Sequence, residues 1–244
     1  MHVKICKDYA LLSEMMAREV LIQVEKRAES VLCFPSGDTP IGLFARLADL
    51  HKKGTVDFSS CRFVGLDEWV GMDETDEGSC KHTLYHKLFY PLGIQMKNIV
   101  FFDAKADDLN EECERIDRII HTLGGIDLMI LGVGMNGHLG LNEPGVNENL
   151  YSHLVLLHPV TKKTGQKYFK TAASLTQGIT LGLKHIMEAK HVIGMISGNH
   201  KAEIARIAIE GNISSQVPAS ILRNHRNATI YLDEEAAKYL NIQN

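Results

Sequence analysis

The chain has 244 residues, enough for one α/β domain with a large buried core. Hydrophobic residues make up 45% and charged residues 23% of it, which is typical of globular proteins and excludes a disordered chain. The formal net charge is −4 and the lysines and arginines are scattered, so no basic surface for nucleic acid is indicated. No apolar stretch approaches the length of a membrane span, and the first residues lack a signal-peptide core. We therefore expect a cytoplasmic protein that binds neither nucleic acid nor membranes.

Five cysteines occur at irregular spacing, with no C-x-x-C pair among them. An odd number without paired spacing predicts neither a disulfide framework nor a structural zinc site. Cys33 and Cys61 lie inside apolar runs, so we expect both to be buried as small hydrophobic side chains.

Apolar runs of strand length alternate with amphipathic segments of helix length, which is the pattern of parallel βαβ units. The expected strands, in chain order, are 30–34, 62–66, 99–102, 126–131, 153–157, 191–196 and 229–232. The expected helices are 40–51 (capped by Asp38 or Thr39), 82–90, 109–123, a helix that includes 165–170, and 200–210. We predict one α/β domain over residues 1–244 with a doubly wound, mainly parallel sheet.

Four polar segments follow predicted strands of this sheet. Their sequences are S-G-D-T-P at 36–40, D-E-W at 67–69, G-M-N-G-H at 134–138 and S-G-N-H-K at 197–201. In doubly wound sheets, ligands bind outside the carboxyl ends of the strands. We therefore expect the four segments to meet at a single site.

Two of these segments are suited to binding an anion. The small residues of the 36–40 segment allow backbone N–H groups at a helix start to approach a phosphate. Lys201 adds a compact cation at the start of another helix. A well-capped turn and a solvated lysine explain the same residues, and Asp38 disfavours a phosphate unless its side chain caps the helix and points away.

The other two segments carry acid–base chemistry. Two carboxylates in succession at the mouth of a buried strand are costly, which suggests a role for Asp67 and Glu68. Since side chains alternate along an extended segment, one should face the site and the other support the loop. An acidic turn before Gly71 is the alternative.

The glycine-rich segment 132–145 places His138 and Glu143 five residues apart. A histidine titrates near neutral pH and a carboxylate can orient it, so this pair is suited to general acid–base catalysis. A structural histidine is one alternative. Metal binding together with Asp67 is another, but the spacing matches no zinc motif, and we expect no metal.

Together, these segments resemble the glucosamine-6-phosphate deaminase family, also called glucosamine-6-phosphate isomerase. The resemblance runs from about residue 30 to 233 and rests on S-G-D-T-P, L-D-E-W-V-G, S-G-N-H-K and the specific loop G-V-G-M-N-G-H-L-G-L-N-E-P-G. The L-D-E-W-V form, G-I-T-L-G-L-K at 178–184 and V-P-A-S at 217–220 resemble a galactosamine-6-phosphate isomerase branch more closely.

The resemblance implies a single-domain Rossmann-like fold and conversion of an amino-sugar 6-phosphate to a ketose 6-phosphate and ammonia, without metal or organic cofactor. It implies that His138 opens the sugar ring, that Asp67 moves a proton from C2 to C1, and that Glu143 tunes His138. Asn136 holds the imidazole at a position where some relatives carry Asp. A homo-oligomer is left open.

The resemblance also supplies a substrate- and phosphate-binding set, which comprises Ser36, Gly37, Asp38, Thr39, Glu68, Gly137, Lys167 and Lys201. Two members depart from the family pattern. Asp38 replaces the second glycine of a G-G-T-P turn, and Lys167 lies near the place where some deaminases carry an arginine clamp, so the bidentate fork is lost.

Two rival functions remain at this point. A 6-phosphogluconolactonase shares the fold, but it typically carries D-E-R and lacks N-E-P-G, whereas this chain has Trp69 and N-E-P-G at 142–145. A non-catalytic sugar-phosphate sensor typically carries an added DNA-binding segment and loses the acid–base residues. No helix-turn-helix precedes residue 30, and Asp67, His138 and Glu143 are all present.

Overall fold

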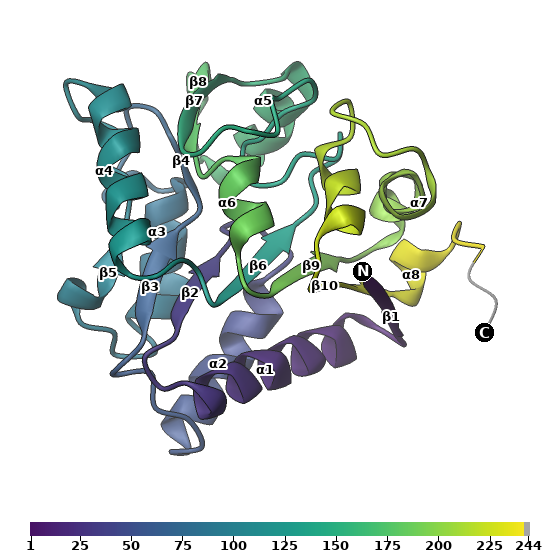
Figure 1. Ribbon diagram of the computed structural model, residues 1–244, viewed down its shortest axis with the longest axis horizontal. Coiled ribbons are helices and arrows are strands. Elements are labelled where there is room, and N and C mark those ends of the chain that lie inside the picture. Colours follow the sequence, from purple (N-terminus) through teal and green to yellow (C-terminus); the bar gives the residue numbers. More distant parts are fainter. Residues whose placement is uncertain (242–244) are drawn as a thin grey trace.

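A seven-stranded parallel sheet forms the centre of the protein (Figure 1). The computed structural model describes residues 1–241. The strands, in spatial order, are β1 (His2–Cys6), β10 (Ala228–Asp233), β9 (Val192–Ile196), β6 (Leu128–Gly132), β2 (Val31–Phe34), β3 (Arg62–Gly65) and β5 (Ile99–Val100). Every adjacent pair is parallel, which confirms the predicted sheet.

The strand order reverses between β2 and β6. From β2 the chain winds outward through β3 to β5, and it then returns to β6 and winds the other way through β9 to β10. At such a switch point the loops that leave neighbouring strands diverge and leave a crevice. The segments after β2, β6 and β9 are therefore brought to the same edge of the sheet.

Helices cover both faces of the sheet. Figure 1 shows α1 and α2 packed together on one side, and α4 and α6 on the other. The α-helices are α1 (Tyr9–Lys26), α2 (Ile41–Lys52), α3 (Cys80–Leu84), α4 (Leu109–Thr122), α5 (Pro159–Gly165), α6 (Leu183–Glu188), α7 (Ala202–Glu210) and α8 (Glu234–Ala237). A π-helical turn at Tyr85–Phe89 extends α3, and 3-10 turns lie at Met96–Asn98, Gln166–Tyr168, Asn199–Lys201 and Pro218–Asn224.

A second, antiparallel sheet lies beside the first. Its strands, in order, are β4 (Asp67–Trp69), β8 (Gln177–Thr180) and β7 (His153–Leu156). The segment 153–157 thus forms the predicted strand, but in this smaller sheet rather than the central one. Asp67 and Glu68 likewise do not simply follow β3, because the chain passes through Leu66 into β4.

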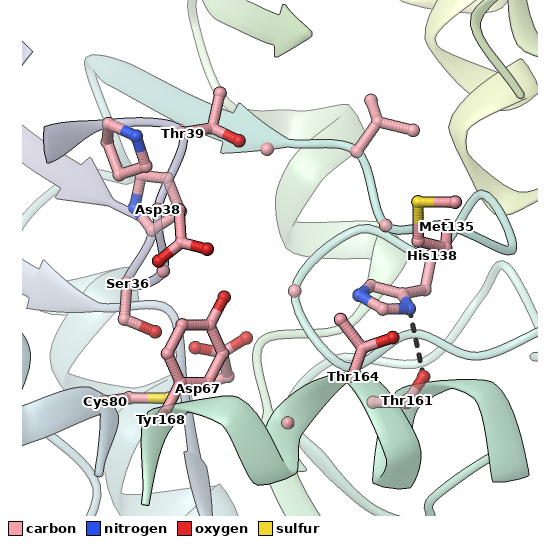
Figure 2. Close-up of a pocket in the computed structure, with 18 of the residues that line it drawn as sticks. Ser36, Asp38, Thr39, Asp67, Cys80, Met135, His138, Thr161, Thr164 and Tyr168 are labelled. Atoms are coloured by element: carbon pink, nitrogen blue, oxygen red, sulfur yellow. Dashed lines mark hydrogen bonds between the residues drawn. The ribbon is translucent and has the colours of Figure 1, made fainter. Parts of the chain in front are cut away.

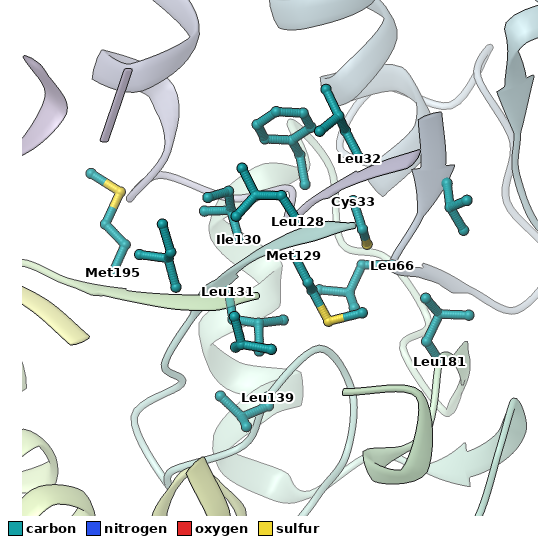
Figure 3. Close-up of a cluster of buried hydrophobic side chains, with 14 of the residues drawn as sticks. Leu32, Cys33, Leu66, Leu128, Met129, Ile130, Leu131, Leu139, Leu181 and Met195 are labelled. Atoms are coloured by element: carbon teal, nitrogen blue, oxygen red, sulfur yellow. The ribbon is translucent and has the colours of Figure 1, made fainter. Parts of the chain in front are cut away.

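The core lies around the central strands. Leu128, Met129, Ile130 and Leu131 are fully buried, as expected for a strand that is covered on both faces (Figure 3). All five cysteines are buried and free, which confirms the prediction for Cys33 and Cys61. In the described range 1–241, no helix is both long and apolar enough to cross a membrane.

Most predicted elements agree with the structure to within two residues at each end, but three differences matter. Six elements were not predicted at all, namely β1, α1, β4, β8, α6 and α8. The helix expected over 165–170 is instead the end of α5 followed by a single 3-10 turn. The expected capping of α2 by Asp38 or Thr39 is wrong, since neither side chain caps it. The Tyr9 hydroxyl instead accepts from the N–H of Gly42 at 2.7 Å and donates to the Thr39 carbonyl at 2.9 Å.

Candidate active site

A cavity of about 750 Å³ opens at the carboxyl ends of the central strands (Figure 2). All four polar segments contribute to its wall, as predicted, because the switch point between β2 and β6 brings their loops together. The expected site residues that line it are Ser36, Gly37, Asp38, Thr39, Asp67, His138, Lys167 and Lys201. Asn136, Glu143, Glu68 and Gly137 do not line it.

The loop after β2 is shaped to bind an anion. Gly37 has a φ of +98°, a conformation that side chains rarely adopt, and a Cβ there would lie 3.1 Å from the Tyr168 hydroxyl. Within the described residues, the N–H groups of Gly37, Asp38 and Thr39 donate to no protein acceptor. Ser36 and Thr39 add hydroxyl groups to the same wall.

Two lysines from distant segments face this loop. Lys167 Nζ lies 2.5 Å from Asp38 Oδ2. Lys201 donates to the carbonyl of Val133. Burial lowers the pKa of Lys201 to about 8, and the nearby Lys167 adds to this effect. The N–H of Gly198 is already bonded to Asp233, so the segment 197–201 contributes Lys201 rather than this amide.

Asp67 forms part of the cavity wall near Ser36 and Cys80 (Figure 2). Its side chain is 7% exposed, and burial raises its pKa to about 7, while a hydrogen bond with Cys80 opposes the rise. A Cβ on Gly140 would lie 2.9 Å from Thr180 Oγ1, so this residue packs closely on β8 beside the Asp67 carboxylate. A carboxyl group with a pKa near neutral can both accept and return a proton.

Glu68 faces away from the cavity, as the alternation along the strand predicts. Its carboxylate accepts from the N–H groups of Trp69, Cys80 and Lys81 at 2.7–2.9 Å. It therefore fixes the start of α3 against β4. Glu68 is fully buried and does not line the cavity, and its expected role in binding substrate stays a prediction.

His138 is oriented by a short relay of polar groups. Asn136 Oδ1 lies 2.7 Å from His138 Nδ1, and Asn136 Nδ2 donates to Glu143 Oε2 at 2.9 Å. Glu143 Oε1 accepts from the N–H of His158, and Glu143 Oε2 lies 3.6 Å from His138 Nδ1. Asn136 and Glu143 thus contact the His138 ring and do not line the cavity themselves.

This relay fixes which imidazole nitrogen carries the proton. Because the Asn136 amide donates to the carboxylate, its oxygen must face the ring and accept from Nδ1–H. Nε2 is then left as the proton acceptor. Burial lowers the pKa of His138 to about 4, which Glu143 opposes, so the imidazole is neutral at pH 7.

Two glycines hold this loop in place. A Cβ on Gly134 would lie 2.2–2.4 Å from the atoms of the His138 ring, so the imidazole packs directly on this residue. Gly137 has a φ of +82°, and a Cβ there would lie 2.7 Å from Val217. Gly137 thus serves the turn and its packing and does not line the cavity, and its expected contact with substrate stays a prediction.

Sequence reasoning missed several side chains that line the cavity. These are Tyr9, Trp69, Cys80, Met135, Thr161, Thr164, Tyr168 and His200. The Thr161 hydroxyl oxygen lies 3.2 Å from His138 Nδ1, the contact drawn in Figure 2. Thr161, Thr164 and Tyr168 come from α5 and the turn after it, a segment that carries no glycine-rich or acidic pattern to mark it. Among residues 1–241, no three His, Cys, Asp or Glu side chains gather as metal ligands do.

Comparison with known protein families shows which family this chain belongs to. The sequence model for glucosamine-6-phosphate isomerases/6-phosphogluconolactonase matches residues 9–231. The chain belongs to this family. The match begins at residue 9 rather than near residue 30, so α1 is part of the family domain.

Its relatives cover the full chain. It is 40% identical to a glucosamine-6-phosphate deaminase from Clostridium tetani, over 98% of this chain and 100% of that one. It is 35% identical to a glucosamine-6-phosphate deaminase from Thermoanaerobacter sp., over 98% and 95% of the two chains.

Two solved structures have a similar fold, one at high and one at low sequence identity. One is of a monomeric glucosamine-6-phosphate deaminase, with a TM-score of 0.94 and 33% identity over 98% of this chain and 99% of that one. The other is of a 6-phosphogluconolactonase from Trypanosoma cruzi, with a TM-score of 0.79 and 18% identity over 99% and 97%. The second likeness concerns the fold alone.

Proposed function

We propose that this protein converts an amino-sugar 6-phosphate to a ketose 6-phosphate and ammonia. The observation that carries the proposal is that a near-neutral carboxyl group, a neutral imidazole and an anion-binding loop line one cavity. Full-length relatives at 35–40% identity that are named glucosamine-6-phosphate deaminases support the same reaction.

The phosphate would bind at the phosphate cradle, which we define as Ser36–Thr39 with Lys167 and Lys201. Free N–H groups, hydroxyls and ammonium groups are the donors that phosphate requires. The sugar would then extend toward the acid–base end, which we define as Asp67 and His138 with the relay Asn136–Glu143. Every residue named lies in one chain, so the proposal requires no oligomer.

His138 would open the sugar ring. Its Nε2 accepts the proton of the anomeric hydroxyl and returns it to the ring oxygen as the bond between C1 and that oxygen breaks, which leaves an aldehyde at C1. A neutral imidazole with a fixed tautomer is suited to this exchange because it starts as an acceptor and ends unchanged.

Asp67 would carry the isomerisation. Its carboxylate takes the C2 proton, which the adjacent aldehyde acidifies, while the C1 oxygen receives a proton from the C2 ammonium group, so that an enol with a neutral amine at C2 forms. The same carboxyl group returns the proton to C1, which leaves an imine at C2. Water adds to the imine and ammonia leaves, so one water is consumed for each ammonia released.

A side-by-side assay tests the proposal. The purified protein is incubated with glucosamine 6-phosphate, galactosamine 6-phosphate and 6-phosphogluconolactone, with unphosphorylated glucosamine as the matched control. We expect ammonia and a ketose 6-phosphate from at least one amino-sugar phosphate and neither product from glucosamine. Lactone hydrolysis without ammonia release from either amino sugar would contradict the proposal. The two epimers together also assign the branch of the family.

A further inference from the structure

We propose that Asp38 competes with bound phosphate for the Lys167 ammonium and so weakens the hold of the phosphate cradle on its ligand. The inference deepens the proposed function and rests on it, since it takes Ser36–Thr39 as the place where phosphate binds. It assigns to Asp38 a role opposite to that of a phosphate ligand.

The ion pair between Asp38 and Lys167 lies on the cavity wall. Lys167 Nζ is 2.5 Å from Asp38 Oδ2, and both residues line the cavity. They come from different elements, the loop after β2 and the 3-10 turn after α5. Figure 2 shows the Asp38 side chain between those of Ser36 and Thr39, on the side that faces the cavity. A phosphate held by this loop would therefore lie beside a carboxylate.

At pH 7 the cradle keeps a net positive charge only from Lys201. Lys167 is neutralised by Asp38, and Lys201 is partly buried with a pKa lowered to about 8. A carboxylate cannot donate a hydrogen bond to phosphate, and it repels a dianion over the same distance at which the lysine attracts it. The Lys167 ammonium can bind phosphate strongly only if its ion pair with Asp38 is broken.

The pair contributes little to the stability of the fold. The Asp38 and Lys167 side chains are 67% and 50% exposed, and exposed ion pairs add little to the stability of a fold. Asp38 does not cap α2, since the Tyr9 hydroxyl serves the first turn of that helix. Variants at these two positions are therefore expected to fold, and a change in affinity can be assigned to charge.

The test measures the affinity for inorganic phosphate by calorimetric titration at pH 7.5. It compares the native protein with Asp38→Asn, Lys167→Met and the double variant. We expect Asp38→Asn to bind about ten-fold more tightly and Lys167→Met about ten-fold more weakly, from the loss of one unit charge near a solvated dianion. The double variant should return to within about three-fold of the native value, because it loses one charge of each sign.

A matched control lies three residues along the same segment. Lys170 Nζ pairs with Glu77 Oε2 at 2.6 Å, and neither residue lines the cavity. Glu77→Gln should therefore leave phosphate affinity unchanged. If Glu77→Gln instead raised phosphate affinity as much as Asp38→Asn does, the cause would be release of the segment that carries Lys167 and Lys170, and the inference would be overturned.

Two further outcomes contradict the inference in distinguishable ways. If Asp38→Asn binds phosphate as weakly as Lys167→Met, then Asp38 positions the lysine for phosphate rather than competing for it. If no variant, including Asp38→Asn, binds phosphate at all, then the phosphate cradle itself is wrong and the proposed function fails with it.

Discussion

The phosphate cradle and the acid–base end share one cavity but are built in opposite ways. The cradle uses backbone N–H groups and side chains that remain half exposed, such as Lys167 and Asp38. At the acid–base end, Asp67 is almost fully buried and His138 is largely buried, and burial raises the pKa of Asp67 to about 7 and lowers that of His138 to about 4.

This difference suggests that the phosphate cradle serves binding and the acid–base end serves proton transfer. Binding a dianion requires donors that can give up water at little cost, and an exposed loop at a helix start provides them. Moving protons at neutral pH requires groups whose pKa values differ from those in water, and burial provides that shift. Changes at one end should therefore affect turnover and changes at the other should affect affinity.

The largest effect is expected from Asp67→Asn. The amide cannot accept the C2 proton, so turnover should fall by about 10³-fold, within the range measured for general bases. Affinity for inorganic phosphate should stay within about two-fold, because the cradle is unchanged. Ammonia release and calorimetric titration give the two values. Unchanged turnover would exclude Asp67 as the base.

The stability of the same variant provides its control. Burial raises the pKa of Asp67 from 3.8 to about 7, so its neutral form favours the fold. The stability from this group is fully present below pH 3.8 and is lost as the pH rises through about 7, where the buried carboxyl group ionises. Asp67→Asn should therefore melt at a higher temperature than the native protein above pH 7, and at a similar temperature near pH 4.

The second effect concerns ring opening. In His138→Gln no imidazole is left to exchange protons with the sugar ring, so turnover of the closed-ring substrate should fall by about 10²-fold. An open-chain analogue bypasses that step and should lose no more than a few-fold. The ratio of the two rates is the measurement, and equal losses on both substrates would remove ring opening from the role of His138.

A smaller effect is expected from crowding the imidazole without changing it. The new methyl group of Gly134→Ala would lie within 2.4 Å of the His138 ring and must displace it, so turnover should fall by about 10- to 50-fold. Gly132→Ala is the control, since a Cβ there meets no atom within 4 Å. Comparable losses in the two variants would show that the ring position is not what matters.

The smallest effect concerns the pH dependence of binding. Lys201 has a pKa lowered to about 8, so its positive charge is lost as the pH rises through that value. Affinity for inorganic phosphate should therefore fall between pH 7.5 and 9.5, by at most ten-fold per pH unit, although the ligand becomes more fully dianionic over the same range. Lys201→Met should bind more weakly at pH 7.5 and show a flat profile, and a flat profile in the native protein would assign the affinity to other groups.

The sequence predicts the central sheet well because its strands are short apolar runs ended by glycine or polar residues, and 128–132 is the clearest of them. It also predicts that the polar segments converge, since parallel strands present their carboxyl ends at one edge. The antiparallel pairing of β4 and β7 with β8 is different. The β4–β8 pairing joins residues more than 100 positions apart, such as Asp67 with Thr180, and β7 joins β8 across the intervening α5 segment, and no local pattern records either pairing.

Within the site, the sequence predicts which kinds of side chain are present better than it predicts which way each side chain points. Alternation predicts that Asp67 and Glu68 face opposite ways, but not which one faces the cavity. The structure answers this through α3, whose first N–H groups bind the Glu68 carboxylate. Tyr168 and Thr161 lie outside any recognisable motif, and only the fold of α5 over the loops brings them to the cavity.

The Tyr9 hydroxyl, at the first residue of α1, is hydrogen-bonded to the start of α2. An aromatic side chain from the first helix braces the turn that precedes Gly42, so the opening segment is structurally joined to the ligand-binding edge. A fragment that starts at residue 30 would keep every residue of the family motifs and still lack this brace. Shortened or permuted versions of the protein should therefore keep α1 attached to the loop that it supports.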